Sequence, residues 1–171
     1  MWEVTQNEKL NMVKDYRFDH RTKKEFAEDI KSSTKEELRL FKLWLKNKTP
    51  PGTKFKATGC GSDGEFLSSA KASSEADFYV DGIGPIEVKF AKPFLDKVFH
   101  LKVTNVLSYI KQGASILMFN GSDTKNTTYT LIPPIILQEI KDTCKIVDWQ
   151  GMGAKPCFRI NIDMLKWETL T

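Results

Sequence analysis

The segment Glu75-Ala76-Asp77-Phe78-Tyr79-Val80-Asp81-Gly82-Ile83-Gly84-Pro85-Ile86-Glu87-Val88-Lys89-Phe90 contains two short apolar runs separated by a turn. The runs cover 78–80 and 86–90, and the Asp-Gly pair between them is typical of tight turns. The pattern therefore predicts a β-hairpin. Alternation along the second strand places Glu87 and Lys89 on one face and the apolar side chains of that strand on the other.

Asp77 precedes the first strand, and a hairpin brings it alongside Glu87, so two carboxylates and the Lys89 amine converge. Neighbouring carboxylates repel each other unless a cation lies between them, and Mg²⁺ prefers such oxygen ligands. A lysine beside the metal orients or deprotonates an attacking water, or neutralises a phosphorane-like transition state. These groups suffice for phosphodiester hydrolysis. The alternative is a plain hairpin with a surface Glu–Lys pattern.

The residues on both sides of the hairpin predict helices and further strands. The elements expected before residue 120 are a helix over 23–30, a second helix over 34–47 after a break at Ser32-Ser33-Thr34, a strand over 53–58, a long glycine-rich loop over 59–74, a helix over 101–112 and a strand over 115–119. Those expected later are a strand over 127–132, a helix from Pro133/Pro134 to Lys141, and strands over 145–149 and 157–162. The order predicts an α/β fold with a mixed central sheet flanked by helices.

Length and composition limit the class of protein. The 171 residues fit a single domain, and 40% hydrophobic with 28% charged residues is a soluble, globular mixture. The net charge of +4 permits nucleic-acid binding without requiring it. No apolar run approaches a membrane span, and the N-terminus lacks the order of a secretion signal. Cys60, Cys144 and Cys157 have no metal-site spacing and are expected to be free thiols, so we expect a cytoplasmic protein.

Asp77, Glu87 and Lys89, within the order helix, three strands, helix, strand, resemble the PD-(D/E)xK nuclease superfamily, which has the restriction-endonuclease-like fold. Ala76 stands where the motif of that family has proline. The resemblance implies an αβββαβ core over about 34–119, with additions over 120–171. It also implies that Asp77, Glu87 and the main-chain carbonyl of Val88 bind Mg²⁺, with Mn²⁺ as a substitute, and that Lys89 is the catalytic amine.

Other residues are weaker candidates for the site. Many members of the family add an acidic residue from the helix before the first strand, for which we favour Glu37 over Glu36 and Glu28. Negative charge in the first turn of a helix is an equally good explanation. Gln112 and Asn105 lie in the helix after the motif and are further candidates. The remaining polar residues that we considered are better explained as turn, loop or surface groups: Asp63, Glu65, Asp81, His20 and His100.

The resemblance implies a Mg²⁺-dependent endonuclease acting on double-stranded DNA, site-specific in the manner of restriction or homing enzymes. Such enzymes are often homodimers and occur in bacteria and phages. The alternatives are a Holliday-junction or repair nuclease of the same fold and a non-catalytic nucleic-acid-binding module. Basic residues near the motif are candidates for phosphate contacts, although solvated lysines are common. They are Lys54, Lys56, Lys92 and Lys97.

Overall fold

The computed structural model describes residues 23–59 and 75–171, which form three α-helices and two β-sheets. The elements in chain order are α2 (Lys23–Lys48), β1 (Phe55–Ala57), β2 (Phe78–Val80), β3 (Gly84–Ala91), β4 (Val98–Lys102), α3 (Val103–Gln112), β5 (Ser115–Asn120), β6 (Thr128–Ile132), α4 (Pro134–Thr143), β7 (Lys145–Trp149), η3 (Gln150–Met152), β8 (Lys155–Asn161), η4 (Ile162–Met164) and β9 (Glu168–Thr169). Most of the predicted 59–74 loop lies outside the described residues, as do His20 and Cys60.

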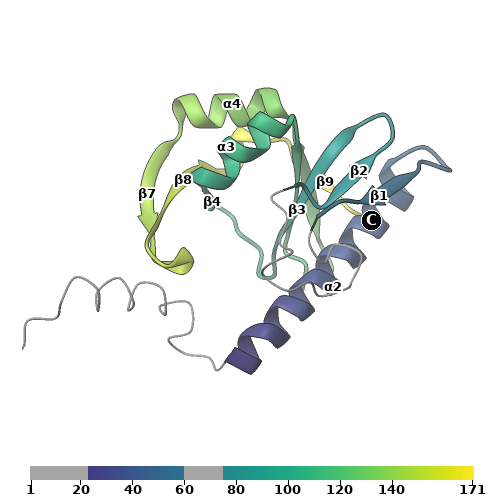
Figure 1. Ribbon diagram of the computed structural model, residues 1–171, viewed down its shortest axis with the longest axis horizontal. Coiled ribbons are helices and arrows are strands. Elements are labelled where there is room, and N and C mark those ends of the chain that lie inside the picture. Colours follow the sequence, from purple (N-terminus) through teal and green to yellow (C-terminus); the bar gives the residue numbers. More distant parts are fainter. Residues whose placement is uncertain (1–22, 60–74) are drawn as a thin grey trace, which may run out of the picture.

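The central sheet has six strands in the order β1-β2-β3-β5-β6-β9. The predicted hairpin is confirmed as β2 and β3, which pair antiparallel with Phe78 opposite Ile86. β5 lies parallel to β3, with Val88 opposite Leu117, because α3 carries the chain back across the sheet between them. All other pairs in this sheet are antiparallel. The predicted mixed sheet flanked by helices is therefore confirmed (Figure 1).

Helix α2 covers one face of the central sheet. Its residues Leu40, Phe41 and Trp44 are buried, and the ring of Phe41 stacks on Phe78 of β2 with a centroid distance of 3.9 Å. The predicted break at Ser32-Ser33-Thr34 is wrong, since α2 continues from Lys23 to Lys48. The Thr34 hydroxyl donates to the carbonyl of Ile30 at 3.0 Å, so this side chain is satisfied within the helix and does not cap a new one.

The other face packs on α3, α4 and a second sheet of order β4-β8-β7 (Figure 1). Buried side chains that join these elements are Phe99, Leu101, Val106, Leu137, Ile140, Phe158 and Ile160. The predicted start of a helix at Leu101 is wrong, because β4 extends to Lys102 and α3 begins at Val103. Phe99 and Leu101 alternate with less buried residues, which is the period of a strand.

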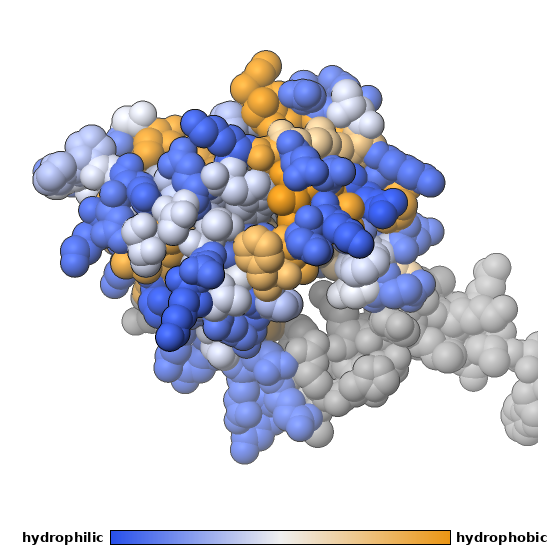
Figure 2. Space-filling model, turned by 180° about the vertical axis from the view of Figure 1, so that it is seen from behind, coloured by the Kyte–Doolittle hydropathy of each residue, from blue (hydrophilic) through white to orange (hydrophobic). Residues whose placement is uncertain are grey.

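The face of the molecule drawn in Figure 2 is mostly hydrophilic. Figure 2 shows hydrophilic side chains over much of the coloured surface, with exposed apolar ones gathered towards the top, the end of the molecule where α4 lies. Ile135 of α4 is the most exposed of the large apolar side chains described. No described helix is both long and apolar enough to cross a membrane. Cys144 and Cys157 are free thiols.

Candidate active site

The hairpin brings Asp77, Glu87 and Lys89 together on the face of the sheet opposite α2. β2 begins at Phe78, opposite Ile86, so the antiparallel ladder ends before Val88. The Val88 N–H instead donates to Asp77 Oδ2 at 2.9 Å. On the next strand position, Lys89 Nζ donates to Glu87 Oε1 at 2.5 Å. Strand alternation and the end of the ladder together place the three functional groups at one point.

Burial and the neighbouring charges shift the pKa values of Asp77 and Lys89 in this cluster. Burial, and then repulsion by Glu87, raise the pKa of Asp77 to about 6, while Lys89 opposes the change. Burial lowers the pKa of Lys89, but attraction to Glu87 and the other acidic neighbours outweighs it and raises that pKa above its ordinary value. Only 10% of the Glu87 side chain and 33% of the Lys89 side chain are exposed. Lys89 is therefore an ammonium group at neutral pH.

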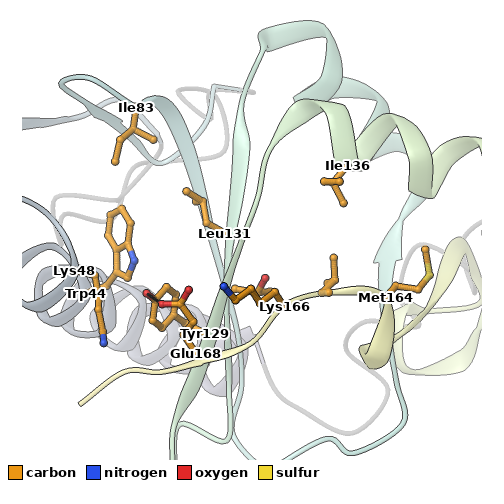
Figure 3. A pocket seen from close by; sticks show the side chains of 11 residues that line it. Trp44, Lys48, Ile83, Tyr129, Leu131, Ile136, Met164, Lys166 and Glu168 are labelled. Atoms are coloured by element: carbon orange, nitrogen blue, oxygen red, sulfur yellow. Dashed lines mark hydrogen bonds between the residues drawn. The ribbon is translucent and has the colours of Figure 1, made fainter.

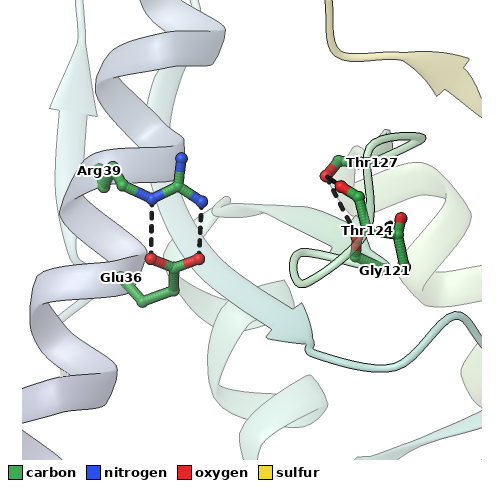
Figure 4. A network of polar contacts seen from close by, with 5 residues as sticks. All are labelled: Glu36, Arg39, Gly121, Thr124 and Thr127. Carbon is green, nitrogen blue, oxygen red and sulfur yellow. Dashed lines mark hydrogen bonds and ion pairs between the residues drawn. The ribbon is translucent and has the colours of Figure 1, made fainter.

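Of the three acidic residues of α2 considered above, Glu37 interacts with the cluster. Burial raises its pKa to about 8, repulsion by Asp77 and Glu87 adds to the effect, and Lys89 opposes it. Glu36 instead pairs with Arg39 through contacts of 2.7 and 2.8 Å, which lower the pKa of Glu36 (Figure 4). Glu28 lies 4.0 Å from Lys24 on the exposed surface. A pKa of about 8 keeps Glu37 mostly protonated at neutral pH.

We expect Glu37→Gln to flatten the pH dependence of stability. The pKa of Glu37 is about 8 in the folded protein against an ordinary value of 4.5, so folding retains a proton and the free energy of unfolding falls as pH rises between these values. The amide removes this titration, and the decline from pH 5 to 8 should shrink by roughly 2 kcal/mol after allowance for partial exposure. Urea unfolding at pH 5 and at pH 8 measures this decline in the free energy of unfolding. Glu36→Gln is the control and should leave the decline unchanged.

Tyr109 also belongs to the cluster, although it was not a predicted site residue. Its hydroxyl donates to Glu87 Oε1 at 2.7 Å, and only 7% of the residue is exposed. Burial raises its pKa above the ordinary value, so the phenol stays protonated. Its position in the sequence, three residues after Val106, puts Tyr109 on the buried face of α3. A buried phenol needs a polar partner, so this position could have pointed to a polar group beneath the helix.

Tyr109→Phe is expected to destabilise the protein by roughly 1.5–3 kcal/mol, the range for a hydrogen bond to a charged group. The phenylalanine ring still fills the space of the tyrosine ring. Glu87 loses the Tyr109 hydroxyl as a hydrogen-bond donor and keeps Lys89. Tyr79→Phe is the matched control, because 47% of Tyr79 is exposed, and it should change stability by less than about 0.5 kcal/mol. Equal effects of the two substitutions on urea unfolding would contradict the assigned hydrogen bond.

Gln112 and Gly59 hold the chain on either side of Asp77. Gln112 Oε1 accepts the Ala76 N–H at 3.1 Å, and its Nε2 donates to Ser108 at 2.9 Å. The N–H groups of Thr58 and Gly59 both donate to the Asp77 carbonyl. A Cβ at Gly59 would lie 2.7 Å from the Asp77 Cα, which leaves room only for glycine. Gln112 is thus adjacent to the site, as a positioning residue.

The other described candidates lie on several elements of the fold. Strand pairing sets Lys56 opposite Tyr79, so Lys56 shares the face of Asp77, and Lys54 lies two residues earlier. Lys92 directly follows β3 and is close enough to lower the pKa of Glu36, and Lys97 directly precedes β4. Three others have different surroundings: Asp81 lies in the hairpin turn, Asn105 beside Thr104 on α3, and His100 is stacked on Trp149 in the second sheet.

The donor set suits a hard divalent cation. Asp77 and Glu87 supply carboxylate oxygens; burial is the main cause of the raised pKa of Asp77, and repulsion by Glu87 adds to it. The N–H and C=O of one residue point to the same side of an extended strand, so the Val88 carbonyl is directed towards the edge where its N–H meets Asp77. The described residues contain no group of three or more His, Cys, Asp or Glu side chains that could hold a metal. The candidate ligands here are two carboxylates and a carbonyl, fewer than Mg²⁺ needs, and Mg²⁺ commonly completes such a set with water and phosphate oxygens.

A pocket of about 570 Å³ lies elsewhere, between α2, β6, α4 and the C-terminal segment (Figure 3). Trp44, Tyr129, Glu168 and Lys166 line it, and the Tyr129 hydroxyl donates to Glu168 at 2.8 Å. None of its lining residues belongs to the Asp77 cluster. The pocket is thus separate from the candidate active site.

Comparison of the chain with protein-family models, with curated proteins and with solved structures gave no match.

Proposed function

We propose that the protein is a Mg²⁺-dependent endonuclease that hydrolyses phosphodiester bonds in double-stranded DNA. The observation that carries this proposal is the convergence of Asp77, Glu87 and a protonated Lys89 at the end of the β2–β3 ladder. A surface Glu–Lys pattern would leave these groups exposed and their pKa values ordinary. Here the pKa of Asp77 is raised to about 6, and Glu87 is buried. Perturbed, converging groups of this kind are typical of functional sites.

In this proposal Asp77, Glu87 and the Val88 carbonyl hold Mg²⁺, which supplies an activated water and a counter-charge for the phosphate when bound. The Val88 N–H fixes the orientation of the Asp77 carboxylate. Tyr109 and Lys89 both donate to the same oxygen of Glu87, Oε1, which holds that carboxylate beside Asp77. The protein's own hydrogen bonds thus prepare both acids for a cation.

Lys89 and Glu37 have separate parts in the proposed reaction. Since the raised pKa of Lys89 keeps it charged, its part is to stabilise the negative charge that develops on the phosphate, rather than to act as a base. Glu37, with a pKa of about 8, can donate or accept a proton near neutral pH. We place Glu37 at the site as a group that moves or holds a proton.

The arrangement of elements supports the same proposal. Around the cluster the chain runs through α2, the β1-β2-β3 meander, β4, α3 and β5, with β3 and β5 parallel and β4 paired in the second sheet. Apart from β4, this order matches the αβββαβ core of the restriction-endonuclease-like fold, which we propose for the protein. We further propose that cleavage is site-specific, that the protein acts as a homodimer, and that it works in the cytoplasm of a bacterium, as a bacterial or phage protein.

The test is incubation of the purified protein with long duplex DNA, in Mg²⁺ or in EDTA, followed by mapping of the ends. The proposal expects cleavage in Mg²⁺ and Mn²⁺ only, with ends at recurring sequences. Preferential cutting of a four-way junction would instead support the junction-nuclease alternative. Binding of duplex without cleavage under any metal condition would favour the non-catalytic module and overturn the proposed activity.

Neutralising any one of the predicted phosphate contacts should weaken DNA binding about equally for all sequences. Each lost contact should also reduce the slope of log affinity against log salt by roughly one unit, because one fewer counterion is released. The variants are Lys→Ala at Lys54, Lys56, Lys92 and Lys97. Titrations of labelled duplex across a salt series in EDTA measure both quantities. Unchanged slopes at all four positions would place the DNA on another face.

A further inference from the structure

Within residues 23–59 and 75–171, one face of the second sheet contributes no side chain to either hydrophobic core cluster, although Cys157 on it is buried. Alternation divides its strands: Phe99, Leu101, Phe158 and Ile160 belong to the core beneath α3 and α4, so their neighbours face the other way. Strand pairing aligns His100 with Arg159 and Arg159 with Lys145, and it sets Trp149 opposite Lys155. These residues, together with Lys102, Val147, Cys157, Val98 and Asn161, form what we call the outer face.

The charge of the outer face is entirely positive. It carries Lys102, Lys145, Lys155 and Arg159, and none of its positions in β4, β7 or β8 is an acid. Asp148 is the one acidic residue of the three strands, and alternation places it on the opposite face. Lys145, Lys155 and Arg159 are exposed. Like charges directly across a sheet repel each other, so a row such as Arg159–Lys145 favours an anionic partner.

An aromatic pair stands within this positive surface. The rings of His100 and Trp149 stack with a centroid distance of 3.9 Å and an interplanar angle of 7°. Burial and the nearby Arg159 lower the pKa of His100, so the imidazole is neutral at neutral pH. The backbone of Gly151 lies against the indole edge, since a Cβ there would come within 2.6 Å of Trp149 Nε1. The indole is thus held in one orientation, with 42% of Trp149 exposed.

We propose that the outer face is a second DNA-binding surface, in which Lys145, Lys155 and Arg159 contact phosphates and Trp149 contacts a sugar or base. Surface cations hold duplex DNA through its phosphates, and sheet surfaces that bind single-stranded nucleic acid add aromatic rings among such cations. The inference rests on the proposed function in one respect, that DNA is the partner. It adds a surface formed by residues that take no part in the Asp77 cluster.

The test compares two double variants that each remove two positive charges. Lys145→Ala/Arg159→Ala alters the outer face, and Lys125→Ala/Lys141→Ala alters exposed residues of the β5–β6 connection and α4. Anisotropy of a fluorescein-labelled 30-base-pair duplex is measured in EDTA over a salt series. The outer-face pair should weaken binding at least about tenfold and reduce the salt slope by roughly two units. The control pair should change affinity less than about twofold.

A second measurement uses Trp149 itself. Trp149→Phe keeps a ring on His100 but should weaken duplex binding roughly fivefold and remove part of the fluorescence quenching that DNA causes in the wild type. Equal effects of the two double variants, or displacement of DNA by polyglutamate as effectively as by unlabelled duplex, would overturn the inference. Wild-type protein that does not bind the duplex would overturn it too. Binding through the outer face without Mg²⁺-dependent cleavage would uphold it while refuting the proposed nuclease activity.

Discussion

Asp77→Asn and Glu87→Gln are each expected to abolish DNA cleavage while leaving DNA binding intact or improved. Each substitution removes a negative charge that would face phosphate, and each removes a carboxylate needed to hold Mg²⁺. In Asp77→Asn the amide oxygen can still accept the Val88 N–H, so the hairpin should keep its geometry. Loss of the repulsion that raises the pKa of Asp77 should leave the folded protein as stable as the wild type or more so.

Cleavage rates and binding titrations of the two variants, made beside Asp81→Asn, separate these effects. Asp81 lies in the exposed hairpin turn four residues after Asp77, so its change to Asn alters charge in the same segment without touching the cluster. It should cut at the wild-type rate. A near wild-type rate in Asp77→Asn or Glu87→Gln would show that the proposed metal site is wrong.

Lys89→Ala should fold normally and lose roughly 100- to 1000-fold or more in the rate of cleavage. The ammonium group lies in the proposed site, hydrogen-bonded to Glu87, and removing one such preorganised donor commonly costs this much. Glu87 retains the Tyr109 hydroxyl as a donor, so its carboxylate is not left without a partner. Calorimetry should show that Mg²⁺ binding is retained, because Lys89 is not a ligand.

Lys125→Ala is the control for this experiment, since Lys125 is an exposed lysine of the β5–β6 connection. Its cleavage rate should stay within about twofold of the wild type. Unfolding of Lys89→Ala under conditions where the control is folded would mean that the Glu87–Lys89 pair is structural. Stable folding with an unchanged rate would exclude Lys89 from the chemistry.

Local patterns were sufficient to predict the β2–β3 hairpin and the meeting of Asp77, Glu87 and Lys89. A strand places every second side chain on one face, and an Asp-Gly turn fixes which residues lie opposite one another, so this geometry follows from a few adjacent residues. The buried stripe of α2 around Phe41 and the strand 115–120 were predictable for the same reason. These features depend on spacing along the chain.

Residues whose role depends on distant segments could not be predicted in this way. The sequence around Thr34 is compatible with a helix cap or with a helix interior. In the structure the Thr34 hydroxyl donates to the Ile30 carbonyl, and the helix continues through this residue. Leu101 fits a strand or a helix, and pairing with Phe158 of β8 decides it. Tyr109 and Gln112 reach the site only because α3 packs across the strand that carries Glu87, bringing together residues more than twenty positions apart.

The sequence by itself therefore determined the hairpin, its alternating faces and the three residues of the motif, because these need only the period of a strand. Only the tertiary structure decided that Glu37, rather than Glu36, interacts with the cluster, since Glu36 is held by Arg39 and the raised pKa of Glu37 comes from burial and from Asp77. Likewise, His100 and Trp149 lie 49 positions apart, and pairing through β8 brings their rings together. Contacts between segments far apart in the chain depend on how whole elements pack, which no local pattern encodes.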